Sequence, residues 1–342
     1  MTDRRLLPSP QSVEDQFPDG CRCGTPSRME FVVQPSTGKT QGNSGSVSRH
    51  SIPQAVIAPA SFAMGDSSGD RNRFDGEEPQ HTVSLGAFSI DVTTVTNADF
   101  ARFISDTGYR TEAEEYGFSA VFHSAVRAED SDIIGAAEHA PWWLAVRGAD
   151  WAHPVGPQSD LQALGDHPVV HVTWNDADEY CNWAGRRLPT EAEWEVAARG
   201  GIAEAKFPWG DAAIDEGGWR ANIWQGSFPD ANTSEDGFVL TAPVRSFEPN
   251  GYGLWQPIGN VWEWCADWFD PRYYRVSPPN NPRGPETGRA RVLRGGSYLC
   301  HDSYCNRYRN SARSSNTPDS SMGNAGFRTV SPLAPPSATQ NA

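Results

Sequence analysis

The sequence predicts an α+β domain with little regular secondary structure, few long helices and a core packed around large indole side chains. Glycine and proline support this, because the 342 residues include 32 glycines and 27 prolines, above ordinary usage. The 13 tryptophans supply bulky groups for the core. Two segments combine the apolar spacing and capping residues of a helix, and one further helix is expected. The length suffices for one large domain or two small ones.

Composition divides the chain into three parts. Residues 1–50 are rich in Ser, Pro, Gly and Gln and have almost no periodic apolar pattern, so we expect a disordered leader. The ordered domain is expected over residues 51–333, beginning where the short apolar runs of "SIPQAVIAPASFAMGD" alternate with turn residues. The tail over residues 334–342 is again expected to be disordered.

Three helices are expected, in chain order. Thr96 and Asp99 have capping-box spacing at the start of "TNADFARFISDTG", and Gly108 marks the end of that helix. A second helix is expected through "DADEYCNWAG". In the third, "PTEAEWEVAARGG", Thr190 is the cap, Glu193 completes the box and two glycines end the helix. The rest of the domain, to about residue 332, is expected to form turns and short strands.

Charge and cysteine usage exclude several classes of protein. With 28 Lys and Arg against 43 Asp and Glu, the net charge is −15, which argues against a nucleic-acid partner. No run of 18 apolar residues exists, so no membrane span is expected. The N-terminus has no apolar stretch of the kind found in secretory signals. Six scattered cysteines give no disulfide framework, so we expect a reducing, cytoplasmic location.

The segment "SYLCHDSYC" carries Cys300 and Cys305 with four residues between them. On an α-helix, positions five apart are rotated by about 140° from each other, so a helix would point these side chains apart. A loop or a twisted strand brings them together, and the "GGS" immediately upstream supports a tight backbone.

Several functions remain open for this pair. A local disulfide, or two unrelated buried thiols, is the simplest, although a reducing compartment disfavours the disulfide. Zinc requires four ligands, and the other close pair, Cys21 and Cys23, lies in the leader. A nucleophilic cysteine requires a histidine, but the adjacent His301 is poorly placed, since neighbouring residues rarely face one site. Cu(I) accepts two thiolates in a near-linear arrangement, and a third thiolate from outside can join.

The segment 293–328, "LRGGSYLCHDSYCNRYRNSARSSNTPDSSMGNAGFR", closely resembles the C-terminal part of the formylglycine-generating enzymes. Four further segments resemble the same family in the same order, and the resemblance covers roughly residues 53–332. They are "HPVVHVTWNDA" (167–177), "GRRLPTEAEWEVAARGG" (185–201), "ANIWQGSFPDANTSEDGF" (221–238) and "GNVWEW" (259–264). The paired cysteines are the specific part, because the other motifs mark the whole superfamily.

The resemblance implies a fold and an activity. The fold is a variant C-type-lectin-like fold with low regular secondary structure. The activity is a copper-dependent oxidation, with O₂, of the cysteine in a C-x-P-x-R motif of a sulfatase polypeptide to Cα-formylglycine.

The resemblance also implies the site residues. Cys300 and Cys305 would hold Cu(I), Ser297 would form hydrogen bonds near the sulfur or oxygen, and Trp262 would shape a dry surface. Residues expected at the substrate wall or just behind the site are His301, Tyr304, Ser321 and Asn324.

Structural calcium is the second cofactor that the resemblance implies. "DANTSEDG" is not an EF-hand, because the twelfth position counted from Asn232 is Pro243, where a glutamate is required. The positions that match the family's calcium ligands are Asn222, Ile223, Asp236 and Phe238 for one ion, and Gln256, Gly259, Val261 and Glu263 for a second. Gln256 stands where an asparagine is usual.

Two alternative functions remain. A non-catalytic lectin-like binding module has no reason to carry the thiol pair. An iron-dependent sulfoxide synthase requires a His-rich helical metal site, and the eight histidines form no such pattern. Cys181 and Cys265 receive no role from the sequence.

Overall fold

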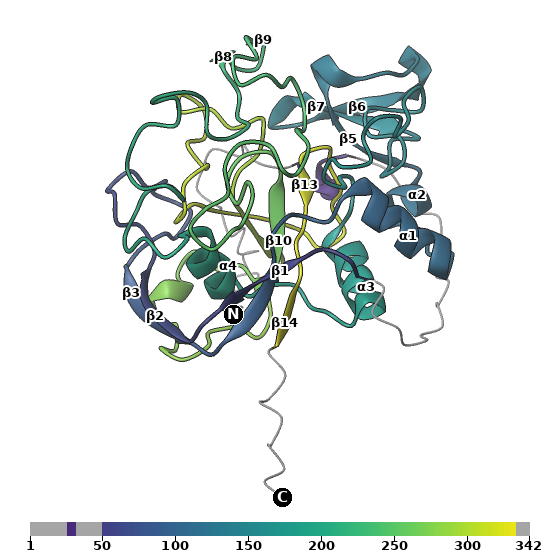
Figure 1. The fold of residues 1–342 in the computed structure, drawn as a ribbon. Helices are drawn as coiled ribbons and strands as arrows, with labels where there is room; N and C mark the ends of the chain where they lie inside the picture. The colour runs from purple at the N-terminus through teal and green to yellow at the C-terminus, as the bar shows by residue number, and fades with distance from the viewer. Residues whose placement is uncertain (1–25, 32–49, 333–342) are drawn as a thin grey trace, which may run out of the picture.

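The computed structural model of the chain describes residues 26–31 and 50–332. Its centre is a four-stranded sheet in the order β12-β11-β10-β13 (Figure 1). Strand β10 (Trp262–Trp268) pairs antiparallel with β11 (Arg291–Arg294) and parallel with the short β13 (Ala325–Gly326). Strand β12 (Arg313–Asn316) completes the sheet beside β11. This sheet holds the segments on either side of the cysteine pair in fixed register.

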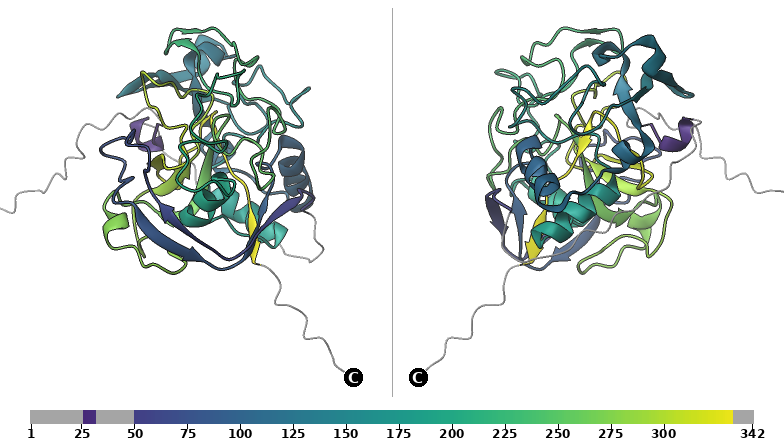
Figure 2. Two further views of the ribbon diagram at one scale, coloured as in Figure 1. Left: turned by 60° about the vertical axis from the view of Figure 1, so that its left-hand side comes forward. Right: turned by 90° about the vertical axis from the view of Figure 1, so that its right-hand side faces the viewer.

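Four smaller sheets surround this centre (Figure 2). In the first, β4 (Phe88–Asp91) lies between β1 (Gln54–Ile57) and β14 (Val330–Pro332) and is antiparallel to both, which joins the two ends of the domain. The others are β2 (Ala60–Met64) with β3 (His81–Leu85), β5 (Phe118–Phe122) and β6 (Ile133–Ala137) on either side of β7 (Ala140–Arg147), and β8 (Gly226–Ser227) with β9 (Ala231–Asn232). Short 3-10 turns are η2 (His123–Ala125), η3 (Asp130–Asp132) and η4 (Tyr273–Arg275).

The helices begin at threonine caps, as the sequence predicts for two of them. The helices are α1 (Asn97–Thr107), α2 (Glu112–Tyr116), α3 (Trp174–Ala184) and α4 (Glu191–Ala198), and each has a complete capping box. Helix α3 begins earlier than expected, because Thr173 caps it with Asp176 as the third residue. Helix α4 ends at Ala198, with Arg199 as its C-cap, before the two glycines. The five-residue α2 was not predicted, since it is too short for a periodic pattern.

The core is built on indoles, as composition predicts. Trp143, Trp194, Trp262 and Trp264 are among the largest fully buried side chains. Every residue of α4 is buried. Cys300 and Cys305 belong to the same apolar cluster as these tryptophans, so the candidate site is part of the main core.

Residues 26–31 pack on the domain, which corrects the expectation of a disordered leader for this stretch. Ser27 caps η1 (Arg28–Glu30), and the side chains of Arg28 and Phe31 are buried. The Phe31 ring lies edge-on to Phe118, with 6.1 Å between centroids. Composition does not reveal this packing, because the contacts come from distant segments. Residues 1–25, 32–49 and 333–342 lie outside the described residues.

Candidate active site

The two cysteines lie in one tight turn, as the spacing argument predicts. The carbonyl oxygen of His301 accepts hydrogen bonds from the backbone N–H groups of Tyr304 (3.1 Å), Cys305 (2.9 Å) and Asn306 (3.0 Å). Asn306 has a φ of 49°, the left-handed conformation that commonly ends a helical turn. The backbone therefore closes after one turn and returns Cys305 to the side of Cys300.

The glycine before Ser297 is required by the approach of two neighbouring segments. Gly296 has a φ of 74°, and a Cβ at this position would lie 2.8 Å from the carbonyl oxygen of Arg307 and 3.2 Å from Sγ of Cys300. Only glycine combines that φ with such close packing. The "GGS" signal thus reflects how closely the chain folds around the thiols.

The two thiols are buried, free and in hydrogen-bonding contact. Each cysteine is only 2% exposed, and neither forms a disulfide. Burial raises the pKa of Cys300, and its hydrogen bond with Cys305 raises it further. Burial opposes ionisation of Cys305 as well, but the hydrogen bond from Cys300, those from the backbone of Arg307 and His301, and the Arg309 guanidinium together lower its pKa. The shared hydrogen bond thus lowers the pKa of Cys305 and raises that of Cys300.

Ser297 and Asn324 meet beside this pair. The backbone N–H of Ser297 donates to Sγ of Cys300 (3.4 Å), and Nδ2 of Asn324 donates to Oγ of Ser297 (2.9 Å). Both residues are fully buried. The structure therefore brings together Cys300, Cys305, Ser297 and Asn324 from segments on both sides of β12, as the resemblance implies.

Trp262 lies behind this group and inside the core. Its backbone N–H donates to the carbonyl oxygen of Asn324 (2.8 Å), so the first residue of β10 fixes the position of that loop. The side chain is fully buried in the main apolar cluster, and its indole N–H has no hydrogen-bond partner among the described residues. Its contacts are those of a core residue.

Tyr304 and His301 lie on the outer side of the turn. The Tyr304 ring stacks on Phe228 at 4.0 Å between centroids and lies edge-on to Trp142 at 5.3 Å. His301 is directed at its own turn, with Nδ1 2.7 Å from Oγ of Ser303. Sequence reasoning missed Trp142 and Phe228, because no local pattern marks either as a neighbour of Tyr304.

Ser321 lies apart from the thiols but in the loop that leads to Asn324. Its hydroxyl oxygen is 2.8 Å from that of Ser119, and it accepts a hydrogen bond from Nη2 of Arg28 (3.0 Å). The structure therefore divides the expected substrate residues into two places, with Ser321 in contact with the N-terminal segment.

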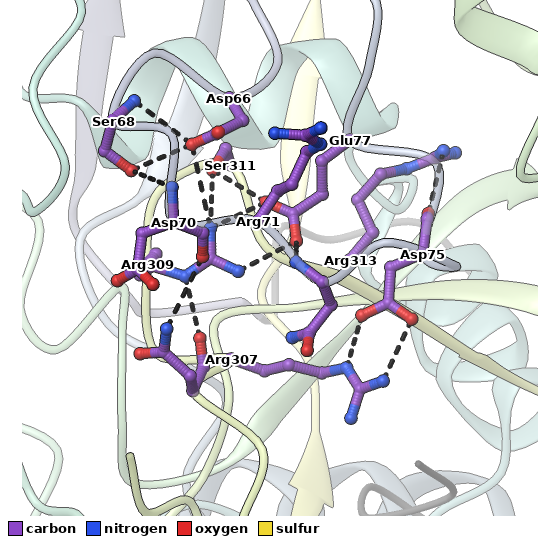
Figure 3. Close-up of polar contacts among 12 residues, drawn as sticks. Asp66, Ser68, Asp70, Arg71, Asp75, Glu77, Arg307, Arg309, Ser311 and Arg313 are labelled. Atoms are coloured by element: carbon purple, nitrogen blue, oxygen red, sulfur yellow. Dashed lines mark hydrogen bonds and ion pairs between the residues drawn. The ribbon is translucent and has the colours of Figure 1, made fainter. Parts of the chain in front are cut away.

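A network of buried ion pairs fixes the chain after the cysteine turn (Figure 3). Arg307 donates through Nη2 to Asp75 (2.9 Å), and Arg309 binds both oxygens of Glu77 (2.7 and 2.8 Å). Nε of Arg309 also donates to the carbonyl oxygen of Asn306 (2.8 Å), at the end of the turn. The acidic partners of these arginines lie far away in sequence, so no local pattern marks the pairs.

The donor set suits a soft metal. Among residues 26–31 and 50–332, no group of three or more His, Cys, Asp or Glu side chains is placed to hold a metal ion, which removes a four-ligand zinc site from this region. The two contacting thiols meet the lower demand of Cu(I), which accepts two thiolates. Copper thus fits the residues present.

In the first expected calcium set, Asp236 is hydrogen-bonded to Ile223 and Phe238. Asp236 accepts from the backbone N–H of Ile223 (3.1 Å) and from that of Phe238 (2.9 Å). The amide of Gln225 bridges the Ile223 carbonyl and Asp236. Oδ1 of Asn222 is buried and has no partner among the described residues. The Asp236 carboxylate and the unpartnered amide oxygen of Asn222 are ligand types that a hard cation takes.

The second calcium set fits less well. Oε1 of Gln256 is buried without a partner in the described part of the chain. The carboxylate of Glu263, however, binds Arg328 through both oxygens (2.7 Å each) and accepts from Nε1 of Trp194 (2.8 Å). An ion at this place would compete with a buried ion pair, so the Glu263 side chain does not fit as a ligand.

Comparisons with known proteins agree with this geometry. The family model described as "Sulfatase-modifying factor enzyme 1-like domain" matches residues 40–333. A Streptomyces coelicolor protein named "Formylglycine-generating enzyme" is 62% identical over 275 residues, which cover 80% of this chain and 88% of that protein. A Bos taurus protein named "Inactive C-alpha-formylglycine-generating enzyme 2" is 43% identical over 274 residues, covering 79% and 85%.

Solved structures share the fold. PvdO from Pseudomonas aeruginosa has a TM-score of 0.59 at 24% identity and covers 82% of this chain and 94% of its own. Treponema denticola variable protein 1 has a TM-score of 0.54 at 23% identity, with coverage of 81% and 94%. The fold is the expected α+β, variant C-type-lectin-like fold.

The chain belongs to the sulfatase-modifying factor family, which includes the formylglycine-generating enzymes. No helix among the described residues is long and apolar enough to cross a membrane.

Proposed function

We propose that this chain is a copper-dependent oxidase that converts the cysteine of a C-x-P-x-R motif in a sulfatase polypeptide to Cα-formylglycine, with O₂ as oxidant. The observation that carries the proposal is the pair of free thiols of Cys300 and Cys305, in contact within one buried turn. The relatives named formylglycine-generating enzymes support the same activity.

The reaction balances only with an added reductant. Conversion of the substrate –CH₂SH group to –CHO and H₂S consumes one water molecule and releases two electrons. Reduction of O₂ to water requires four electrons, so a thiol reductant supplies the other two and becomes a disulfide. Reduction of O₂ forms two water molecules and the substrate hydrolysis consumes one, so the net products contain one water and one aldehyde oxygen.

The residues of the turn have distinct tasks. Cys300 and Cys305 would hold the copper ion as thiolates, and the lowered pKa of Cys305 favours loss of its proton. Bound copper would supply a thiophilic redox centre that accepts the substrate thiolate and reacts with O₂. Ser297 holds Sγ of Cys300 through its N–H, and Asn324 orients the Ser297 hydroxyl. Tyr304, Phe228 and Trp142 offer an aromatic wall to an extended peptide.

Calcium at Asn222, Ile223, Asp236 and Phe238 is part of this proposal as a structural ion. A cytoplasmic location is part of it too, and the free thiols of Cys181 and Cys265 support a reducing compartment.

The alternatives are weaker. A lectin-like binding module does not require a buried thiol pair beside an oriented serine. An iron-dependent sulfoxide synthase requires several histidine or carboxylate ligands, and the described residues contain no such group.

Mass spectrometry of a C-x-P-x-R peptide tests the proposal. With protein, copper, O₂ and a dithiol, the cysteine peptide is expected to lose about 18 Da and to release one H₂S per aldehyde. A peptide with serine at the cysteine position should remain unchanged, because a hydroxyl is a poor ligand for a soft ion. Conversion of both peptides at similar rates would contradict the mechanism.

A further inference from the structure

Residues 24–28 read Gly-Thr-Pro-Ser-Arg. Aligned with C-x-P-x-R, Pro26 and Arg28 take the positions of the motif's proline and arginine, while glycine stands where the substrate has its cysteine. The pattern P-x-R alone is weak, because it also occurs at Pro243–Arg245. What distinguishes the first copy is its place in the fold.

The segment from Pro26 to Arg28 contacts the loop that leads to Asn324 and β13. Nδ2 of Asn316 donates to the carbonyl oxygen of Pro26 (3.0 Å). The backbone N–H of Arg28 donates to Oγ of Ser320 (2.9 Å), so backbone contacts hold the segment on both sides of Ser27. Ser27 adds a hydroxyl contact of 3.3 Å with Thr317. The main chain of the segment is therefore held by the side chains of Asn316 and Ser320 just before it turns into η1.

The Arg28 side chain enters a site that offers its guanidinium an aromatic face and two hydrogen-bond acceptors. It lies over the Tyr116 ring, with 3.8 Å from its central carbon to the ring centroid. Its Nε donates to the carbonyl oxygen of Asp319 (2.7 Å), and its Nη2 donates to Oγ of Ser321 (3.0 Å). Arg28 is 9% exposed. Planar stacking combined with several donors is the recognition that arginine makes and lysine does not.

Ser321 is the end of a buried chain of hydrogen bonds in which each donor and acceptor can be assigned. His171 lies 2.7 Å from the Pro154 carbonyl through Nε2, which must donate because a carbonyl only accepts. Nδ1 of His171 therefore accepts from the Ser119 hydroxyl (2.7 Å), and Ser119 accepts from Ser321 (2.8 Å). The Ser321 oxygen is left as an acceptor, which the arginine donor satisfies.

The site around Arg28, formed by Tyr116, Asp319 and Ser321, shares one loop with the candidate active site. Ser321 precedes Asn324 by three residues, and Asn324 holds Ser297, whose N–H holds Sγ of Cys300. The arginine of C-x-P-x-R stands four residues after the cysteine, and an extended chain advances at most about 3.3–3.6 Å per residue. The arginine site lies on the same loop as Asn324, the residue that holds Ser297.

We propose that the segment containing Pro26–Arg28 is an intramolecular pseudosubstrate, which rests on the proposed function. It occupies the positions of the substrate's proline and arginine, and the glycine at position 24 gives the enzyme no thiol to oxidise. A sulfatase motif displaces it, and Tyr116, Asp319 and Ser321 form the site that then receives the substrate arginine.

Peptide binding to the metal-free protein tests the occupancy directly. The probe is a labelled C-x-P-x-R peptide with serine at the cysteine position, followed by fluorescence anisotropy. If the segment fills the site nine-tenths of the time, Arg28→Ala is expected to tighten probe binding on the order of tenfold. The matched control is Arg245→Ala, which removes the exposed arginine of the second P-x-R copy and should leave probe affinity unchanged. Unchanged affinity in Arg28→Ala, together with a lowered Tm, would overturn the proposal and make the segment a structural strap.

The Gly24→Cys variant tests the register. With copper, O₂ and a dithiol, the introduced –CH₂SH is expected to become –CHO, with loss of about 18 Da at residue 24 and release of H₂S. The converted fraction should not depend on protein concentration, because the reaction is intramolecular, and adding Arg28→Ala should reduce it. The neighbouring native Cys23 serves as an internal control and should remain unmodified.

The outcomes separate this inference from the proposed function. Conversion of a free C-x-P-x-R peptide without conversion at residue 24, and without tighter binding in Arg28→Ala, refutes the pseudosubstrate and leaves the oxidase standing. Failure to convert any peptide removes the oxidase and the pseudosubstrate with it.

Discussion

The substitution Glu77→Gln tests whether the buried arginine network stabilises the turn that carries the cysteines. Glu77 is 1% exposed, and its two oxygens accept from Arg309 (2.7 and 2.8 Å), from Ser311 Oγ (2.9 Å) and from the backbone N–H of Asn72 (2.9 Å). Glutamine keeps the size but removes the charge and turns an N–H₂ group towards donors. Arg309, which is fully buried, then lacks its close counter-ion, because its next carboxylate, Asp66, is 3.9 Å away.

Breaking one side of a buried pair costs about 3–5 kcal/mol of unfolding free energy. At roughly 2 °C per kcal/mol for a domain of this size, Tm should fall by about 6–10 °C in thermal unfolding followed by circular dichroism. The adjacent Glu78 supplies the control, since its pair with Arg71 is half exposed. Glu78→Gln should cost about 0–1 kcal/mol. Equal Tm shifts in the two variants would refute the reasoning.

Three further predictions concern calcium, pH and substrate. Chelation of calcium should lower Tm, because an ion bound only to the native state stabilises it, and Asp236→Ala should remove most of that shift; identical melting curves with and without chelator would exclude the site. Burial lowers the pKa of His171 to about 4, so the unfolded chain takes up its proton first. The difference in unfolding free energy between wild type and His171→Gln should therefore be fully present above about pH 6.5 and decrease as the pH falls towards 4. A difference that increases in acid would show that the pKa of His171 is not lowered. For the substrate, replacing the motif arginine by lysine should reduce turnover less than replacing it by alanine, measured by peptide mass spectrometry, since lysine keeps the charge; equal losses would show that charge contributes nothing.

Local signals explain which elements were predictable. The boxes at Thr96 and Thr190 predicted α1 and α4 because a capping box needs only four consecutive residues. The strands were harder, since β13 has two residues and is defined by parallel pairing with β10. The three-stranded β5-β7-β6 sheet was not predicted, because its strands are defined by pairing with one another.

The candidate site also combines features that the local sequence predicts with contacts that only the tertiary fold creates. The turn around Cys300 and Cys305 followed from spacing and from the glycines before it. The partners of Arg309 and Tyr304 did not, because Glu77 and Phe228 reach them only through the tertiary fold. The packing of Arg28 on Ser321 is the clearest case, since it places part of an expected leader beside an expected substrate residue.

The central claim is that one Cu(I), held by Cys300 and Cys305, is required to oxidise the substrate cysteine. The most direct test titrates copper into the reduced, metal-free protein and follows both bound Cu(I) and conversion of a C-x-P-x-R peptide. Conversion should rise in proportion to bound copper up to one ion per chain, and both should be lost in Cys300→Ala and Cys305→Ala but kept in Cys265→Ala, which removes a buried thiol outside the turn. Full conversion without copper, or undiminished copper binding in both turn variants, would contradict the account.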